Sequence, residues 1–294
     1  LGNVIAPEDI LKKYGADILR IWVAASNYAE DLRIDYSILD QHSESYRKIR
    51  NTFRYLLGNI NDKYEDIDLD KVDIENLPEL EKFMLSKLHS LNNKFEKYFK
   101  KYDFHNLYKE LLNFCTTDLS AFYFDIRKDT LYCDPINSEK RKSCVTILNV
   151  LLKSLLRWFA PILSFTTEEI HQLISKNTKS IHLEKFLTFP DEFKNEQLTE
   201  RWSQLIKIRD VCNISIEEKR ASKEIGSSLE ADLNIQLNEK YKEIVADMDL
   251  SELCIVSKTV INFDNQSDIL VETKKASGNK CSVCWKIRED PCER

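Results

Sequence analysis

Apolar residues recur every three or four positions through several long stretches of this chain of 294 residues. In residues 41–60 they fall on one side of a helical wheel, and they are Ile49, Phe53, Leu56, Leu57 and Ile60. The same spacing runs through residues 111–126 and residues 144–158. Long amphipathic helices with short connections pack their apolar stripes together. The pattern therefore predicts an antiparallel helical bundle over residues 41–175.

Residues before and within this bundle carry helix boundary signals. Pro7, followed by two acidic residues, is typical of a helix start, so residues 1–40 are predicted to form a connector of one or two helices. Residues 61–82 contain nine acidic residues and three lysines, which indicates a solvated loop and a candidate hinge. Pro161 should end one helix, and Ser164 or Thr166 should cap the next.

The character of the sequence changes after Pro190. Residues 198–219 still have the pattern of a charged amphipathic helix. Three short segments are β-prone or alternate between apolar and polar residues, and they are residues 232–237, 252–256 and 269–272. We expect a mainly α protein, in which a small α+β region over residues 176–275 follows the bundle.

Charge and motif content exclude several classes of function. The formal net charge is −6, which argues against a protein that coats nucleic acid without specificity. The chain has five glycines, and none of them forms a dinucleotide-binding or phosphate-binding loop motif. No histidines have the spacing of a helical zinc protease site. No signal-peptide layout and no apolar run of 18 residues is present, so we expect a cytoplasmic protein without membrane contact.

Eight cysteines divide into two groups. Five are expected to be small buried side chains, and they are Cys115, Cys133, Cys144, Cys212 and Cys254. The other three gather near the end of the sequence, and they are Cys281, Cys284 and Cys292. A Cys-x-x-Cys turn lets two thiolates reach one tetrahedral zinc ion. We therefore expect an incomplete structural zinc site over residues 276–294, with its fourth ligand outside this sequence; a redox dithiol or unligated cysteines are the alternatives.

A basic helical face offers the best local candidate for nucleic-acid contact. It consists of Arg47, Lys48, Arg50 and Arg54, on the side away from the apolar stripe. Arginine forks match phosphate oxygens, and several along one helix side can follow a nucleic-acid backbone. The alternative is an ordinary solvated helix face.

Other residues favour structural interpretations. His105 and His171 have no cluster of ligands beside them, and Trp158 and Trp202 lie in helical apolar stripes. Lys94, Lys97, Lys100 and Lys101 are typical of a solubilised helix surface.

Several segments resemble class I aminoacyl-tRNA synthetases. Residues 1–7 (LGNVIAP) and 14–20 (YGADILR) resemble the segment that follows the Lys-Met-Ser-Lys-Ser loop of that class. The similarity continues through residues 46–52 (YRKIRNT), 121–129 (AFYFDIRKD) and 160–170 (APILSFTTEEI). Residues 220–231 (RASKEIGSSLEA) and the later CSVCW segment resemble the isoleucyl-tRNA synthetase family of bacterial or organellar type.

This resemblance implies a function. Residues 1–40 would be the connector from a catalytic domain, residues 41–175 a helical anticodon-binding domain, and the remainder a C-terminal region that ends in a zinc knuckle. The implied partner is tRNA(Ile), and the implied complete enzyme joins isoleucine to that tRNA with ATP and Mg²⁺. No catalytic residue is assigned in this chain.

The same resemblance implies covalent partners and leaves alternatives. Catalytic and editing domains would belong to the same polypeptide, which we expect to be monomeric and cytoplasmic, or in the mitochondrial matrix. A fragment of a valyl- or leucyl-tRNA synthetase, or a helical interaction module without an RNA role, are the competing hypotheses.

Overall fold

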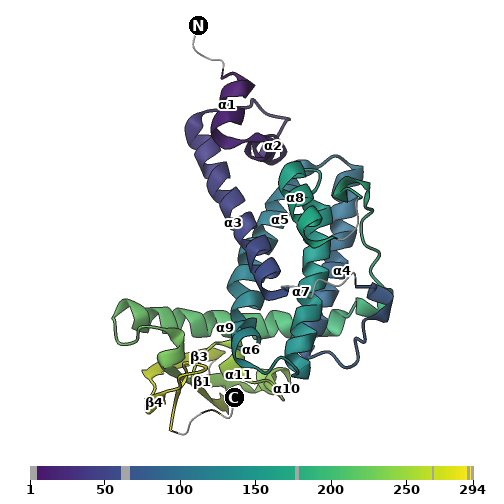
Figure 1. Ribbon diagram of the computed structural model, residues 1–294. Coiled ribbons are helices and arrows are strands. Elements are labelled where there is room, and N and C mark those ends of the chain that lie inside the picture. Colours follow the sequence, from purple (N-terminus) through teal and green to yellow (C-terminus); the bar gives the residue numbers. More distant parts are fainter. Residues whose placement is uncertain (1–4, 61–66, 176–178, 267, 290–291, 293–294) are drawn as a thin grey trace. The chain divides into compact units, whose positions relative to one another are not determined.

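The protein is mainly helical, with its strands near the end of the sequence (Figure 1). This computed structural model describes residues 5–60, 67–175, 179–266, 268–289 and 292. The chain divides into two compact units: the first contains residues 1–125 and 142–194, and the second contains residues 126–141 and 195–294. The mainly α fold with a small C-terminal α+β region is confirmed. The predicted division into four parts is finer than these two units and stays a prediction.

Helices make up the regular structure of the first unit in the ranges given above. They are α1 (Pro7–Tyr14), α2 (Ala16–Ala25), α3 (Tyr36–Ile60), α4 (Glu79–Lys100), α5 (Phe104–Asn113), the π-helix η3 (Phe114–Tyr123), α8 (Ser164–Ile174) and the short 3₁₀ turns η2 (Leu69–Lys71), η4 (Ile181–Leu183) and η5 (Asp191–Phe193). The boundary between residues 125 and 126 lies in α6 (Phe124–Cys133), and the boundary between residues 141 and 142 lies in α7 (Glu139–Phe159). Helix α7 ends just before Pro161, as predicted.

The predicted apolar stripes form the core of the first unit. Ile49, Phe53 and Leu56 on α3 are almost completely buried. The Trp158 ring meets the Phe95 ring edge to face at 4.9 Å between centroids, and its indole N–H donates to the side chain of a buried asparagine, Asn92. Aromatic packing with a satisfied indole N–H is the arrangement that a buried tryptophan requires.

The predicted acidic loop is shorter than expected. Its residues 61–66 lie outside the described part, and α4 begins at Glu79, so the last four residues of the predicted loop are helical. Glu81 is fully buried rather than solvated, because its Oε1 accepts a hydrogen bond of 3.1 Å from the Tyr123 hydroxyl. Counting charges could not distinguish this buried acceptor from its exposed neighbours.

Two charged side chains of helix α2 hold the turn between α7 and α8. Asp17, which is buried, accepts hydrogen bonds from the backbone N–H (2.8 Å) and the hydroxyl (2.6 Å) of Thr166. Arg20 donates to the carbonyl oxygens of Pro161 (2.6 Å) and Ile162 (2.9 Å). The carboxylate thus caps the positive end of α8, and the guanidinium satisfies carbonyls that Pro161 leaves outside a helix.

The predicted cap of α8 is therefore wrong. Neither Ser164 nor Thr166 caps the helix. The N-cap position is Leu163, whose side chain makes no capping hydrogen bond. The hydroxyl of Ser164 donates back to the carbonyl of Ala160, and Thr166 donates to Asp17. A carboxylate 149 positions away in the sequence has taken the role that local spacing assigned to a hydroxyl.

The second unit combines one long helix with a small sheet. Its elements are α9 (Glu196–Ala221), η6 (Ser228–Glu230), β1 (Ala231–Asn238), η7 (Glu239–Tyr241), α10 (Lys242–Val245), α11 (Leu250–Leu253), β2 (Lys258–Asp264), β3 (Ile269–Lys275), β4 (Asn279–Lys280) and β5 (Ile287–Arg288). Strand β1 lies between β2, which is parallel to it, and β3, which is antiparallel. Trp202 on α9 is buried, as predicted. The strands predicted over residues 232–237 and 269–272 are confirmed.

The strand predicted over residues 252–256 is wrong. Those residues form the end of α11 and a turn, and the actual strand is β2, which follows them. Asp249 explains the difference, because its carboxylate caps α11 through the N–H groups of Ser251 (2.8 Å) and Glu252 (3.2 Å). A parallel strand also needs a crossover connection, and α10 and α11 lie in it.

Removing the Asp17 carboxylate tests this turn. The substitution Asp17→Ala should lower the free energy of unfolding by about 2 kcal/mol, because it removes a buried, charge-assisted cap and leaves N–H donors unsatisfied. Denaturant titration followed by circular dichroism measures this effect. The exposed Asp9→Ala variant is the control and should change stability by less than about 0.5 kcal/mol. Equal effects of the two variants would contradict the capping role.

Candidate nucleic-acid interface and cysteine cluster

Helix α3 presents the predicted basic face to solvent. Arg47, Arg50 and Arg54 lie three or four residues apart and are exposed, so they form one stripe along the helix. Lys48 is also exposed but lies about 100° further round the helix. The structure therefore brings three of the four predicted cations into a row and places the fourth beside it.

The arginine stripe has few internal partners. Arg47 forms an exposed ion pair with Glu44 at 2.5 Å, which contributes little to stability in solvent. The Arg50 guanidinium lies 5.9 Å from the centre of the Tyr46 ring. Lys48 and Arg54 make no ion pair with any residue of the described ranges. Lys48 and Arg54 are therefore available to bind a ligand of opposite charge.

The two singled-out histidines make structural hydrogen bonds, as their surroundings predicted. A ring nitrogen of His105 lies 2.6 Å from the carbonyl oxygen of Ala25, and one of His171 lies 3.1 Å from that of Lys179. The predicted solubilising lysines include Lys94, which pairs with Glu110 at 2.7 Å. None of these contacts creates a nucleophile or a metal site.

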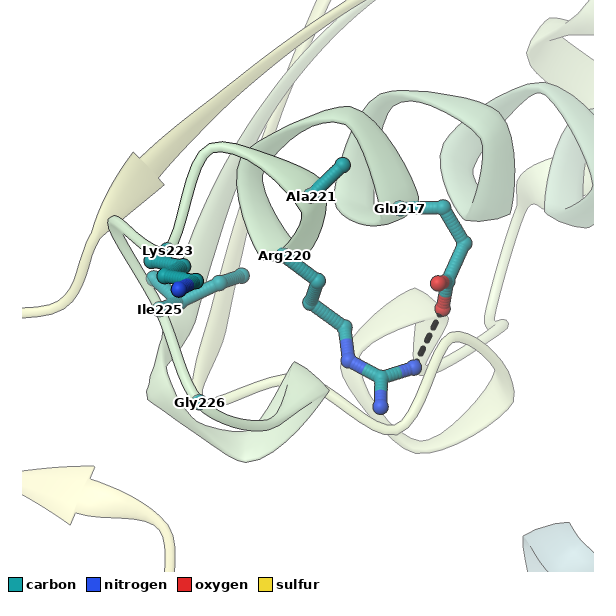
Figure 2. Close-up of a pocket in the computed structure, with 6 residues that line it drawn as sticks. All are labelled: Glu217, Arg220, Ala221, Lys223, Ile225 and Gly226. Carbon is teal, nitrogen blue, oxygen red and sulfur yellow. Dashed lines mark hydrogen bonds and ion pairs between the residues drawn. The ribbon is translucent and has the colours of Figure 1, made fainter.

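The motif over residues 220–231 shapes an open pocket of 480 Å³ (Figure 2). It is lined by Glu217, Arg220, Ala221, Lys223, Ile225 and Gly226. Arg220 donates to Glu217 at 2.5 Å, and the N–H of Gly226 donates to Glu230 at 2.9 Å. The segment closes α9 and leads into β1, so the pocket lies at the end of the long helix.

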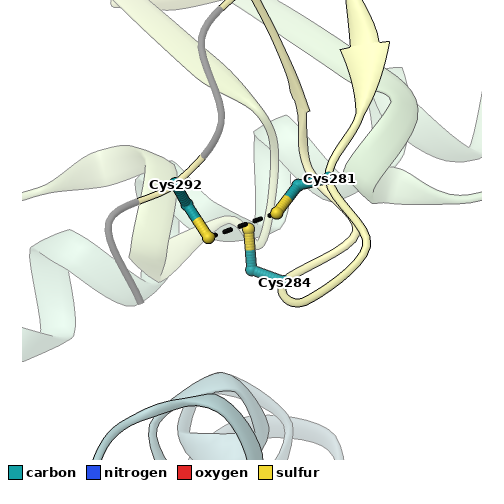
Figure 3. Close-up of side chains that lie close together, drawn as sticks. All are labelled: Cys281, Cys284 and Cys292. Atoms are coloured by element: carbon teal, nitrogen blue, oxygen red, sulfur yellow. Dashed lines mark hydrogen bonds between the residues drawn. The ribbon is translucent and has the colours of Figure 1, made fainter.

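The three terminal cysteines come together (Figure 3). The sulfur atoms of Cys281, Cys284 and Cys292 all lie within 4.8 Å of one another, and those of Cys281 and Cys292 are 3.2 Å apart. Four thiolates around one zinc ion at about 2.3 Å lie roughly 3.8 Å from each other. The cluster therefore has the donor type and the size to hold a metal ion, and three of the four positions of a tetrahedral site are present.

Electrostatics in the cluster favour a thiolate at Cys281. The backbone N–H of Cys284, the thiol of Cys292 and the backbone N–H of Val283 lower the pKa of Cys281 to about 6. Burial instead raises the pKa of the Cys284 thiol. One cysteine thus offers a metal-binding thiolate at neutral pH, while another must lose its proton to bind.

Backbone and side-chain hydrogen bonds fix the cysteine turn to the second unit. The N–H of Cys281 donates to the carbonyl of Lys286 at 2.9 Å, and the N–H of Ile287 donates to the Ser257 hydroxyl at 2.6 Å. Lys286 is buried, which lowers its pKa, while the charge of Asp249 opposes that shift. The turn is held in place by the fold as well as by its own cysteines.

One cysteine differs from its prediction. Cys115, Cys144, Cys212 and Cys254 are buried, and burial raises the pKa of Cys115 to about 12. Cys133 is only half-buried, and its thiol donates to the carbonyl of Val283 at 3.4 Å. Its position follows from the packing of α6 beside the cysteine turn, which periodicity within one helix does not reveal.

Trp285, the last residue of the CSVCW segment, is a candidate binding residue. Its side chain is 60% exposed, and the Lys280 ammonium lies 5.4 Å from the centre of its ring. Large aromatic side chains are normally buried, so this exposure is unusual. In the sequence, the signal that could have identified Trp285 is its position directly after a Cys-x-x-Cys turn. An exposed ring beside a cation is suited to stacking on a nucleotide base.

Two family profiles match this chain. The profile described as "Anticodon-binding domain of tRNA ligase" matches residues 81–237, which is more than half of the chain. The profile described as "tRNA synthetases class I (I, L, M and V)" matches residues 1–35.

The helices of the described ranges include none that is both long enough and apolar enough to cross a membrane.

Several curated relatives share one name. A protein named isoleucine–tRNA ligase from Pelagibacter ubique is 67% identical over all 294 residues and 32% of its own length. Proteins of that name from Kosmotoga olearia and Bartonella henselae are 39% and 38% identical, over 97% and 99% of this chain. The chain spans about a third of the length of these relatives. On the evidence of the profile that covers most of its helices and its first strand, the chain belongs to the family of anticodon-binding domains of tRNA ligases.

Proposed function

We propose that this chain is the tRNA-binding part of an isoleucine–tRNA ligase and that its partner is tRNA(Ile). The observation that carries the proposal is the similarity of the whole chain to proteins of that name. In such an enzyme isoleucine is activated with ATP and Mg²⁺ and transferred to tRNA, and we assign that chemistry to the part of the longer relatives outside this match. The catalytic and editing domains would then be covalent partners, in a monomeric enzyme of the cytoplasm or the mitochondrial matrix.

Phosphate binding by α3 is the first contact in this proposal. Arg47, Arg50 and Arg54, with Lys48 beside them, would neutralise phosphates along the tRNA backbone. Arginine offers two parallel N–H donors to a phosphate, and the exposure of this stripe supports the assignment. Such contacts fix orientation and register without reading sequence.

Base stacking is the second contact. Anticodon bases lie in a single-stranded loop, where proteins recognise them by stacking on aromatic rings and by hydrogen bonds to base edges. The exposed Trp285 ring, with Lys280 beside it, would provide one stacking surface. The cysteine turn would fix this ring in place, with Zn²⁺ held by Cys281, Cys284 and Cys292 and by a fourth ligand that we do not assign.

The identity of the tRNA provides the direct test of this function. The chain should bind a tRNA(Ile) transcript more tightly than tRNA(Val), and exchanging the anticodons should exchange the preference, because single-stranded bases carry the sequence information. Fluorescence-anisotropy titrations with the four transcripts measure this. Equal affinity for all four would contradict anticodon recognition.

Substituting one arginine of the stripe tests the phosphate contact. Arg50→Ala should weaken binding to every tRNA alike and lower the slope of log Kobs against log salt by about 1, since one phosphate contact releases about one counterion. Titration at several salt concentrations gives the slope. Lys100→Ala, which removes an exposed lysine on α4, is the control and should leave the slope unchanged. An unchanged slope in Arg50→Ala would remove this residue from the interface.

Metal analysis tests the cysteine cluster. Elemental analysis after zinc loading and desalting should find one zinc ion per chain, and Cys281→Ser should lose most of it. Retention should fall as the pH drops, because protons compete with the metal ion for the thiolates. Cys133→Ser is the matched control, because serine can still donate to the Val283 carbonyl and the residue lies outside the cluster. Equal zinc content in both variants would contradict a zinc site.

A further inference from the structure

Helix α9 ends at a lysine in a left-handed backbone conformation. Ser222 follows the last residue of the helix, and Lys223 has φ +60°. The N–H of Lys223 donates to the carbonyl of Arg220 at 3.0 Å, and that of Glu224 donates to the carbonyl of Lys219 at 3.1 Å. These two bonds form a Schellman motif, in which the left-handed position is most often occupied by glycine.

Lysine is an unfavourable choice at this position. Its Cβ crowds the backbone when φ is positive, whereas glycine adopts the conformation without that penalty. Residues held in such conformations cluster at functional sites. The side chain of Lys223 is therefore a candidate for a function that glycine cannot fill.

The residues that line the pocket include two cations, Lys223 and Arg220, and one carboxylate, Glu217. Glu224 is bound by Lys219 at 2.9 Å, and Glu230 is bound by the backbone of Gly226. Within the described ranges, Lys223 makes no ion pair. Among the described residues, Arg220 pairs with its exposed neighbour Glu217, through one of its nitrogens. The nearby carboxylates are thus occupied, while both cations of the pocket can still bind an anion.

We propose that this pocket binds a phosphate group of the RNA backbone, held by the ammonium of Lys223 and the guanidinium of Arg220. Figure 2 shows both side chains at the end of α9, with the Arg220 guanidinium directed toward Glu217. The volume of 480 Å³ exceeds what one phosphate needs and leaves room for the adjoining sugars.

This inference rests on the proposed tRNA-binding function and adds a contact to it. The simpler alternative is that Lys223 only complements the negative end of the α9 dipole. The two explanations predict different RNA affinities when the Lys223 side chain is removed. If Lys223 interacts only with the helix dipole, its removal should leave RNA affinity unchanged.

The substitution Lys223→Gly separates stability from binding. It should raise the melting temperature, because glycine relieves the left-handed strain. It should also weaken tRNA(Ile) binding severalfold and lower the salt slope by about 1, because one phosphate contact is lost. Lys223→Arg, which keeps the charge, should retain the wild-type slope. Differential scanning fluorimetry and anisotropy titration provide the two measurements.

A matched control exists in the same unit. Asp247 is exposed and also has φ +60°, so Asp247→Gly should raise the melting temperature in the same way. Because this change removes a negative charge, it cannot imitate a loss of RNA affinity. A drop in affinity with Lys223→Gly but not with Asp247→Gly supports the phosphate site.

The remaining outcomes overturn the proposal in distinguishable ways. If wild-type protein binds tRNA(Ile) and Lys223→Gly keeps its affinity and slope, the pocket is not part of the interface. If wild-type protein binds no tRNA, the proposed function fails together with this inference. Inorganic phosphate at constant ionic strength should leave the melting temperature unchanged. A rise in wild-type protein that is absent in Lys223→Gly would identify free phosphate as the ligand instead of RNA.

Discussion

The buried carboxylate of Asp17 connects three separate segments of the first unit. It accepts the hydroxyl proton of Thr166, so the Tyr46 hydroxyl, 2.8 Å from the same Thr166 oxygen, must act as the donor in that second bond. The ring of Tyr46 in turn lies beside the Arg50 guanidinium. Charge-assisted bonds at a helix start are strong and directional. Through Thr166, Asp17 thus orients the tyrosine that lies beside one arginine of the stripe on α3.

The cysteine turn depends on the second unit in a comparable way. The hydroxyl of Ser257 donates to the carbonyl of Leu229 and accepts from the N–H of Ile287, so one residue before β2 joins the start of β1 to the strand after the cysteine turn. Glu252 binds both Arg127 and Lys140 at 2.6 Å, which fixes α11 to α6 and to the first turn of α7. An exposed tryptophan can serve as a stacking surface only if its backbone is rigid, and these bonds supply that rigidity.

Sequence periodicity predicted the structural features that depend on neighbouring residues. It failed for features that depend on residues far away in the sequence. The buried face of α3 and the end of α7 before Pro161 follow from local pattern and backbone chemistry. The cap of α8 comes from Asp17, which no local rule can supply. The apolar segment before β2 has strand-like composition, yet Asp249 and the crossover connection make it helical. In the candidate site, residue type gave the cations and the thiols, but only the fold reveals the exposure of Trp285.

An acidic protein can bind RNA because electrostatic contacts are local. At physiological ionic strength, charges separated by more than about 8 Å are largely screened, so the net charge of −6 acts weakly on a phosphate held by an arginine. The same net charge discourages contact with nucleic acid through other parts of the surface. Binding strength is then set by the few cations that have no carboxylate partner. Each candidate phosphate contact includes such a cation, since Arg54 on α3 and Lys223 after α9 lack ion pairs in the described ranges. Acidic residues on the rest of the surface thus favour the one orientation of the RNA in which its phosphates meet these cations.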